Sequence, residues 1–233
     1  MFDTLTATLA SGLRFGAGAA VAGAGARPER TLELYEFEAC PFCKRVREAC
    51  SMLDLSVLVR PCPKQGKRYR PWVTETGGRA QFPFLVDPND PEKSEGFYES
   101  DAILQHLFAR YGSGRIPRSL SLPLLPLLTA QLGAALRLPR GISSTPSTPP
   151  EKPLELYGYE ADPGSRQVRE TLCELELPYL LHNVASGSPR RQELRTRAGA
   201  LHIPYLLDPN QSEELSDPAK ICRYLVETYS DPP

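Results

Sequence analysis

The sequence contains the same succession of motifs twice, and this internal repeat constrains the fold more than any other feature. The segment LELYEFEA at 32–39 recurs as LELYGYEA at 154–161, and FPFLVDPN at 82–89 recurs as IPYLLDPN at 203–210. Two copies at this spacing in 233 residues indicate two duplicated domains rather than a solenoid. A domain of roughly 100 residues can bury enough apolar surface to fold without disulfides.

The similarity also extends upstream of each copy, since LTATLASGLRF at 5–15 parallels LTAQLGAALRL at 128–138. Leucines at helical spacing predict a short amphipathic helix before each domain. A transit peptide has no reason to be duplicated inside the chain, so we interpret the N-terminal segment as mature structure. The predicted organisation is a helix and extended segment (1–30), a first domain (31–114), a helix and Pro/Ser/Thr linker (115–153) and a second domain (154–233). The linker core, 141–153, is predicted to be extended and semi-rigid.

Hydrophobic periodicity within each copy predicts the order strand, helix, strand, helix, strand, strand, helix. In the first copy we expect strands at 32–37, 56–60, 84–86 and 96–98, and helices at 41–53 and 101–111. A further helix is expected to start after Arg70-Pro71 and to be ended by Gly77-Gly78. A β-α-β unit followed by a β-β-α unit gives a mixed sheet flanked by helices. The predicted fold class is therefore α/β, with a mixed sheet in each of two tandem domains.

Composition excludes several function classes. The net charge of −1 gives no sign of a nucleic-acid or membrane-surface partner. The most apolar run, 120–138, is interrupted by Pro123 and Pro126 and does not predict a transmembrane helix. Six cysteines in a chain of this length are too few for a secreted disulfide scaffold and favour a reducing compartment.

Two of those cysteines form the motif Cys40-Pro-Phe-Cys43 where the first strand meets the first helix. A helix N-terminus carries partial positive charge and free N–H groups, which stabilise a thiolate. We therefore predict that Cys40 is the nucleophile and that Cys43, one turn further on, resolves a mixed disulfide on it. A Cys-x-x-Cys can also be half of a zinc site, but the chain has no second pair at ligand spacing, so we predict redox chemistry and no metal site.

Three motifs in this order resemble known families. Cys40-Pro-Phe-Cys43 resembles the glutaredoxin motif, Phe82-Pro83 resembles the cis-proline element of thioredoxin-like folds, and YESDAI at 98–103 resembles the Glu-Ser-x-Ala-Ile motif of glutathione S-transferase N-terminal domains. The whole chain is similar to tandem glutathione-transferase-N-terminal-like proteins of cyanobacteria and chloroplasts.

The resemblance implies that glutathione is a co-substrate and that Pro83 is cis. It also gives each domain a thioredoxin-like fold. It pairs the Phe82 backbone with the cysteinyl backbone of glutathione and counts Phe42 and Pro83 among the glutathione-binding residues. It assigns the γ-glutamyl end to Glu99, Ser100 and Asp101. A trans turn proline and an ordinary helix cap are the structural alternatives for these two motifs. The implied partners are glutathionylated or disulfide-containing proteins. The implied location is the chloroplast stroma in a plant or alga, with the transit peptide already absent, and the cytoplasm in a cyanobacterium.

Other residues near the motif modify this expectation. Glutaredoxins often carry a lysine shortly before the motif, whereas this chain has Glu36 and Glu38, which should oppose thiolate formation at Cys40. Cys62, at the end of the second strand, is either an accessory resolving thiol or a small loop residue. Lys64 begins a basic run (Lys64, Lys67, Arg68, Arg70) that either attracts the carboxylates of glutathione or an acidic partner, or is a solvated surface.

In the second copy the motif is replaced by Asp162-Pro-Gly-Ser165, which cannot exchange disulfides. This domain is interpreted as a non-redox scaffold or a partner-binding module. The predicted function is a glutathione-linked, glutaredoxin-like thiol–disulfide oxidoreductase acting through Cys40. The alternatives are a binding module for glutathione or an iron–sulfur cluster with little catalysis, and a weak glutathione transferase or peroxidase.

Overall fold

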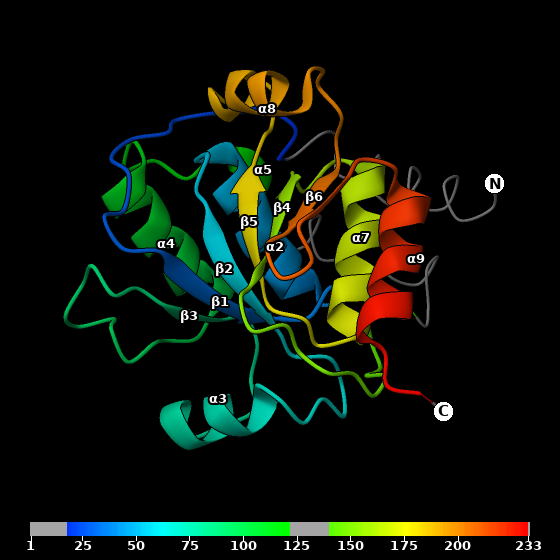
Figure 1. Cartoon of the computed structure of the whole chain (residues 1–233). Coiled ribbons are helices and arrows are strands. Elements are labelled where there is room, and N and C mark those ends of the chain that lie inside the picture. The colour runs from blue at the N-terminus through cyan, green and yellow to red at the C-terminus, as the bar shows by residue number, and fades with distance from the viewer. Residues whose placement is uncertain (1–17, 122–139, 233) are drawn as a thin grey trace.

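The computed structural model describes residues 18–121 and 140–232 (Figure 1). The second copy follows the predicted order of elements, and the first follows it except for its fourth strand. The helices expected at 5–15 and 128–138 lie outside the described residues. The first repeat consists of β1 (Leu32–Glu36), α2 (Pro41–Met52), β2 (Val57–Pro61), α3 (Arg70–Gly77), β3 (Phe84–Val86) and α4 (Ser100–Tyr111), followed by α5 (Arg118–Ser121). The second consists of β4 (Leu154–Gly158), α7 (Pro163–Glu174), β5 (Tyr179–Asn183), α8 (Arg190–Ala198), β6 (Tyr205–Asp208), β7 (Glu213–Leu215) and α9 (Pro218–Tyr229).

One predicted strand of the first repeat is reduced to a single bridge. Residues 96–98 do not form a strand, and only Phe97 pairs, with Leu85. The backbone turns at Gly96, where φ is +93° and an added Cβ would lie 2.2 Å from the ring of Phe84. This close ring contact fixes the turn and leaves no room for a longer ladder.

The two repeats share one sheet of seven strands in the order β3-β1-β2-β5-β4-β6-β7. Each repeat has a parallel pair, β1 with β2 and β4 with β5, and an antiparallel neighbour, β3 or β6. The repeats join where β2 and β5 pair antiparallel, with Val57 opposite Leu181 and Val59 opposite Tyr179 (Figure 1). Because an exposed apolar edge strand invites aggregation, this pairing protects both strands.

A single hydrophobic core runs under both repeats on one face of the sheet. It contains inward-facing residues of the central strands and of α2, α4, α7 and α9, among them Leu34, Val59, Val46, Leu104, Leu156, Leu172 and Leu225. Successive strand residues face opposite sides of the sheet. Tyr35 and Phe84, which follow Leu34 and precede Leu85 in the sequence, therefore belong to a second, smaller cluster with Val73 of α3. This smaller cluster also contains Cys40 and Cys43, so the predicted redox motif lies at the boundary of the first repeat's core.

The segment before each repeat crosses onto the other repeat. Ala20 bridges Ser186, and Ser143 bridges Lys64, which is the position in the first repeat that corresponds to Ser186. The linker docks on the protein, since the Thr145 N–H donates to the Glu174 carbonyl at 2.7 Å. The tandem is therefore held together by the sheet, by the core and by two crossing segments.

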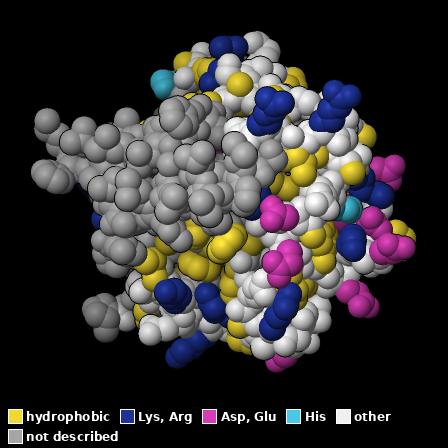
Figure 2. Space-filling model, turned by 180° about the vertical axis from the view of Figure 1, so that it is seen from behind, with side chains coloured by type: hydrophobic (Ala, Val, Ile, Leu, Met, Phe, Trp, Pro, Cys, Tyr) yellow, Lys and Arg dark blue, Asp and Glu magenta, His cyan; other side chains and the backbone are white. Residues whose placement is uncertain are grey.

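On the face shown in Figure 2, basic and acidic side chains are both spread over the described residues. No helix in the two described ranges combines the length and the apolar character needed to cross a membrane.

Candidate functional site

Cys40 is the N-cap residue of α2, with its sulfur accepting a hydrogen bond from the backbone N–H of Cys43 at 3.4 Å. A hydrogen bond from the Cys43 thiol and the N–H groups of Cys43 and Phe42 lower the pKa of Cys40 below its usual value, although burial acts in the opposite direction. The pKa of Cys43 is raised well above the usual value, first by burial and then by its interactions with Cys40. The geometry thus gives two unequal thiols, of which Cys40 is the easier to ionise.

The loop opposite Cys40 carries the second motif. The Phe82–Pro83 peptide bond is cis, as the resemblance implies, and so is Ile203–Pro204 in the second repeat. The Phe82 carbonyl lies 4.0 Å from the Cys40 sulfur. The Arg70 guanidinium lies 4.5 Å from the centre of the Phe82 ring, while Phe42, next to Cys40, is 44 % exposed. The loop that faces the Cys40 sulfur therefore carries an aromatic ring in contact with a cation.

The third motif forms the N-terminus of α4. Glu99 is its N-cap residue, with φ of +74°, a conformation that costs energy for any residue except glycine. Its carboxylate accepts hydrogen bonds from Gln81 at 2.7 Å and from Arg79 at 3.3 Å. Strained backbone of this kind is frequent at functional sites.

Arg45, a residue that the sequence analysis did not single out, ties this third motif to the helix that bears Cys40. Its guanidinium donates to the Ser100 hydroxyl at 3.2 Å and to the Asp101 carboxylate at 2.7 Å. The Arg45 side chain is almost fully buried, whereas Asp101 is exposed. An arginine on an amphipathic helix ordinarily faces solvent, so nothing in the local sequence pattern marks this one.

The two accessory candidates have different positions. Cys62 lies in the same cluster as Cys40 and Cys43, but burial raises the pKa of its thiol well above the usual value, and the thiol donates to the Arg60 carbonyl at 3.4 Å. The structure therefore places Cys62 at the site as a protonated thiol. Lys64 is exposed, and its backbone N–H donates to Ile142 of the linker.

The basic run around Lys64 joins the two repeats. Arg68 donates to the Glu176 carbonyl at 2.5 Å and to the Leu175 carbonyl at 3.2 Å, both at the end of α7. The Glu176 carboxylate accepts the backbone N–H groups of Lys67 and Arg68, both at 3.1 Å. For Arg68, both earlier interpretations, an anion-attracting surface and a solvated surface, are wrong, because its side chain is used in the contact between repeats.

The second repeat keeps the backbone of the site without its thiol. Asp162 has nearly the same N-cap conformation as Cys40 and accepts from the N–H of Ser165 at 2.6 Å. Gly164 stands where the first repeat has Phe42, and a Cβ there would lie 2.8 Å from Pro204 and 2.9 Å from Pro218. Two prolines therefore cover the surface that corresponds to the one around Phe42 in the first repeat. The N-cap position carries Asp162, whose negative charge a helix N-terminus stabilises.

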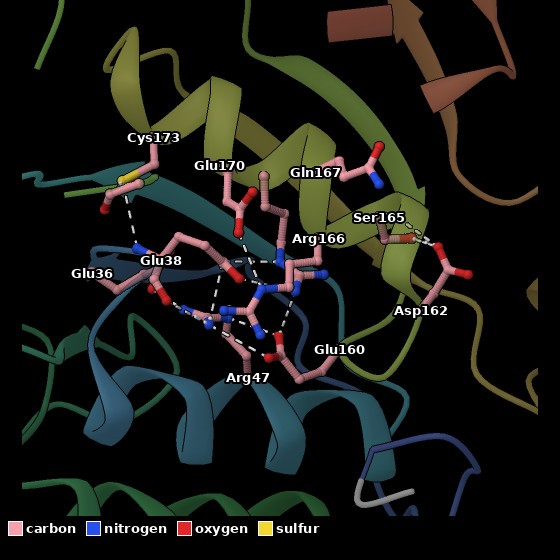
Figure 3. Close-up of polar contacts among 12 residues, drawn as sticks. Glu36, Glu38, Arg47, Glu160, Asp162, Ser165, Arg166, Gln167, Glu170 and Cys173 are labelled. Carbon is pink, nitrogen blue, oxygen red and sulfur yellow. Dashed lines mark hydrogen bonds and ion pairs between the residues drawn. The ribbon is translucent and has the colours of Figure 1, made fainter. Parts of the chain in front are cut away.

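Glu36 and Glu38 face the boundary between the repeats, where they meet Arg47, Arg169 and Glu160 in a buried cluster (Figure 3). Arg47 forms ion pairs with Glu36, with Glu38 at 3.2 Å and with Glu160 at 2.8 Å. Arg169 forms ion pairs with Glu38 at 3.1 Å and with Glu160 at 2.9 Å. Two guanidinium groups thus face three carboxylates.

This cluster changes the expected effect of the two acids on Cys40. Burial raises the pKa of Glu36 to about 7, against the opposing effect of Arg47. Glu36 does act to raise the pKa of Cys40, but it is outweighed by the hydrogen bonds to the Cys40 sulfur. The expectation that acids before the motif oppose thiolate formation is therefore right in sign and small in effect.

Among the described residues, no group of three or more histidine, cysteine, aspartate and glutamate side chains is arranged to hold a metal ion. His106 and His182 instead contact the carboxylates of Asp87 and Glu155, at 2.7 and 2.9 Å.

Comparison with known proteins gives one match. The family model for the glutathione S-transferase N-terminal domain matches twice, over residues 34–115 and 156–233. No curated protein and no solved structure matches the chain. The two matched regions coincide with the two halves of the sheet and confirm the predicted tandem of thioredoxin-like regions. The chain belongs to the family of glutathione S-transferase N-terminal domains, and it carries that domain twice.

Proposed function

We propose that this protein is a glutathione-linked thiol–disulfide oxidoreductase that acts through Cys40. The observation that carries the proposal is the position of the Cys40 sulfur, which caps α2 and accepts the N–H of Cys43. A thiolate is the form that attacks a disulfide, and a helix N-terminus stabilises it. The family match supports glutathione as the partner.

In the proposed reaction, the Cys40 thiolate attacks the glutathione sulfur of a glutathionylated protein. The bond between that sulfur and the protein breaks, the protein sulfur leaves as a thiolate and takes a proton from solvent, and Cys40 carries glutathione. A second glutathione thiolate then attacks the same glutathione sulfur. Glutathione disulfide leaves and the Cys40 thiolate is restored, so that the two electrons that reduce the protein come from glutathione.

The N-terminus of α4 is suited to the γ-glutamyl end of glutathione. Its free N–H groups favour the α-carboxylate, as helix N-termini generally do for anions. The Ser100 hydroxyl is a further hydrogen-bond donor to the α-carboxylate. The Glu99 carboxylate is a counter-charge for the α-amino group. Arg45 fixes Ser100 relative to α2, and therefore relative to Cys40. Phe82 and Pro83 are proposed to contact the cysteinyl part, and the exposed Phe42 ring to cover it.

The test is glutathione-dependent release of glutathione from a glutathionylated protein by the wild type, Cys40→Ser and Cys43→Ser. We expect Cys40→Ser to abolish the activity and Cys43→Ser to retain it, because a second glutathione can resolve the intermediate without Cys43. If Cys43→Ser is as inactive as Cys40→Ser, the enzyme is a strict dithiol reductase. If neither substitution matters, Cys40 is not a nucleophile and a binding module for glutathione or a cluster replaces the proposal.

A further inference from the structure

The loop that delivers Cys40 is held largely by the second repeat. Glu38 lies in this loop, two residues before Cys40, and its carboxylate accepts two hydrogen bonds from Arg169 of α7, at 3.1 and 3.2 Å (Figure 3). Its backbone N–H donates to the sulfur of Cys173, also on α7, at 3.5 Å. Within the first repeat, Arg47 contacts both the Glu38 carbonyl and the Glu38 carboxylate, each at 3.2 Å, so the carboxylate is shared between the two repeats.

This contact is buried and closely packed. The side chains of Glu38 and Arg169 are 2 % and 0 % exposed. The linker packs against Glu38, because a Cβ added to Gly141 would lie 2.9 Å from the Cβ of Glu38. A two-point bond between a guanidinium and a carboxylate fixes orientation as well as distance. The Glu38 side chain therefore has one available arrangement.

The same contact exists in the reverse direction. Arg47 of α2 donates to Glu160, which precedes Asp162 as Glu38 precedes Cys40, and Glu160 N–H donates to Ser51 of α2 at 3.1 Å. Each repeat thus holds the other's motif loop, although only one of the two loops carries thiols. The loop before Asp162 is thus held by the first repeat as the loop before Cys40 is held by the second, but it has no thiol whose pKa the contact could change.

We propose that the second repeat is part of the redox site, and that Arg169 is a positioning residue that fixes the loop before Cys40 through Glu38. This inference rests on the proposed function of Cys40. Only Ala39 separates Glu38 from Cys40, and the Cys40 N–H donates to the Phe37 carbonyl at 3.0 Å, so a displaced Glu38 moves the cap itself. Arg169 shares with Arg47 the neutralisation of the Glu38 carboxylate, which would otherwise repel a thiolate two residues away.

The test compares Arg169→Gln with Arg166→Gln in the full-length chain. Arg166 is a matched control, since it is a buried arginine of the same helix whose partner, Glu170, is also on α7, at 3.1 Å. None of its described hydrogen bonds or ion pairs reaches the loop before Cys40. The measurement is the rate of Cys40 alkylation by iodoacetamide between pH 5 and 10, followed by peptide mass spectrometry. Because this reaction needs neither glutathione nor a protein substrate, it can succeed or fail independently of the deglutathionylation assay.

We expect Arg169→Gln to move the alkylation profile of Cys40 to higher pH, while Arg166→Gln follows the wild type. A displacement of about one pH unit slows alkylation at pH 7 by up to about tenfold and leaves the plateau rate at high pH unchanged. A wild-type profile for Arg169→Gln overturns the proposal, and so does an equal displacement for Arg166→Gln.

Arg169→Lys covers the case in which Arg169→Gln does not fold. Lysine keeps the charge but cannot form the two-point bond, so we expect an intermediate profile. A folded Arg169→Lys chain with the wild-type profile would show that Arg169 does not position the loop.

Discussion

Removing one buried carboxylate, that of Glu36, should make the protein more stable at neutral and alkaline pH. Glu36 is 1 % exposed and shares the guanidinium group of Arg47 with Glu38 and Glu160. Burial raises its pKa from 4.5 to about 7. Between these values the folded chain holds a proton that the unfolded chain has already released, so the free energy of unfolding falls as the pH rises.

The pKa values give the size of the effect. A rise from 4.5 to about 7 corresponds to about 3 kcal/mol, at about 1.4 kcal/mol for each unit of pKa. Glutamine in place of Glu36 cannot deprotonate, and its amide oxygen can still accept from Arg47. Glu36→Gln should therefore exceed the wild type by up to about 3 kcal/mol at pH 8 and by less than about 0.5 kcal/mol near pH 4.5.

The assay is urea unfolding followed by circular dichroism from pH 4.5 to 8. Glu160→Gln is the control of opposite sign. Burial acts to raise the pKa of Glu160, but Arg169, Arg47 and Lys44 outweigh it and hold the pKa at about 2. Glu160→Gln should thus destabilise the protein at neutral pH, with a difference that shrinks as the pH falls from 4.5 towards 2. If Glu36→Gln is less stable than the wild type at pH 8, or if their pH profiles run parallel, the charge argument is refuted.

Three further substitutions separate stability from function. Glu99→Gly relieves the positive φ at the start of α4, so the melting temperature of this variant should equal or exceed that of the wild type. Its KM for glutathione should rise because the carboxylate is lost. An unchanged KM would remove Glu99 from the glutathione site. Asp162→Ala removes an N-cap and should cost about 1 kcal/mol in urea unfolding, with the deglutathionylation rate kept; a lost activity would contradict the assignment of chemistry to the first repeat. Cys62→Ala should keep the wild-type rate, because burial raises the pKa of this thiol well above its usual value; a loss comparable with that of Cys40→Ser would restore Cys62 as a working thiol.

The elements inside each repeat could be predicted from the sequence because their ends are determined locally. Proline in the first turn starts α2 and α3, and Gly78, with φ of +80°, ends α3. The helix expected at 41–53 is found at Pro41–Met52, and the strand expected at 84–86 is found without change. Prolines and glycines with fixed conformations act through their neighbours in sequence, so a pattern of residues is enough to find them.

The association of the repeats could not be predicted in this way. The alternating residues of β2 show that one side of the strand is buried, but they carry no information on what pairs with its edge. The pairing with β5 joins residues more than a hundred positions apart, and so do the contacts of Glu38 with Arg169 and of Arg68 with Glu176. For the same reason Glu38 and Arg68 were interpreted as local charges, whereas their partners lie in the other repeat.

The antiparallel pairing of β2 with β5 has a consequence for how such a protein can change over time. Two separate copies of one domain would meet edge to edge in a concentration-dependent dimer, and any substitution would appear in both copies. A covalent linker supplies the partner in fixed stoichiometry at any dilution and lets each half vary alone. Asp162 is an example, since a thiol could be exchanged for a carboxylate at the cap of α7 without altering its counterpart on α2. Under the proposed function the second half takes no direct part in catalysis. It still cannot be discarded, because it pairs with its neighbour's edge strand and contacts its neighbour's motif loop.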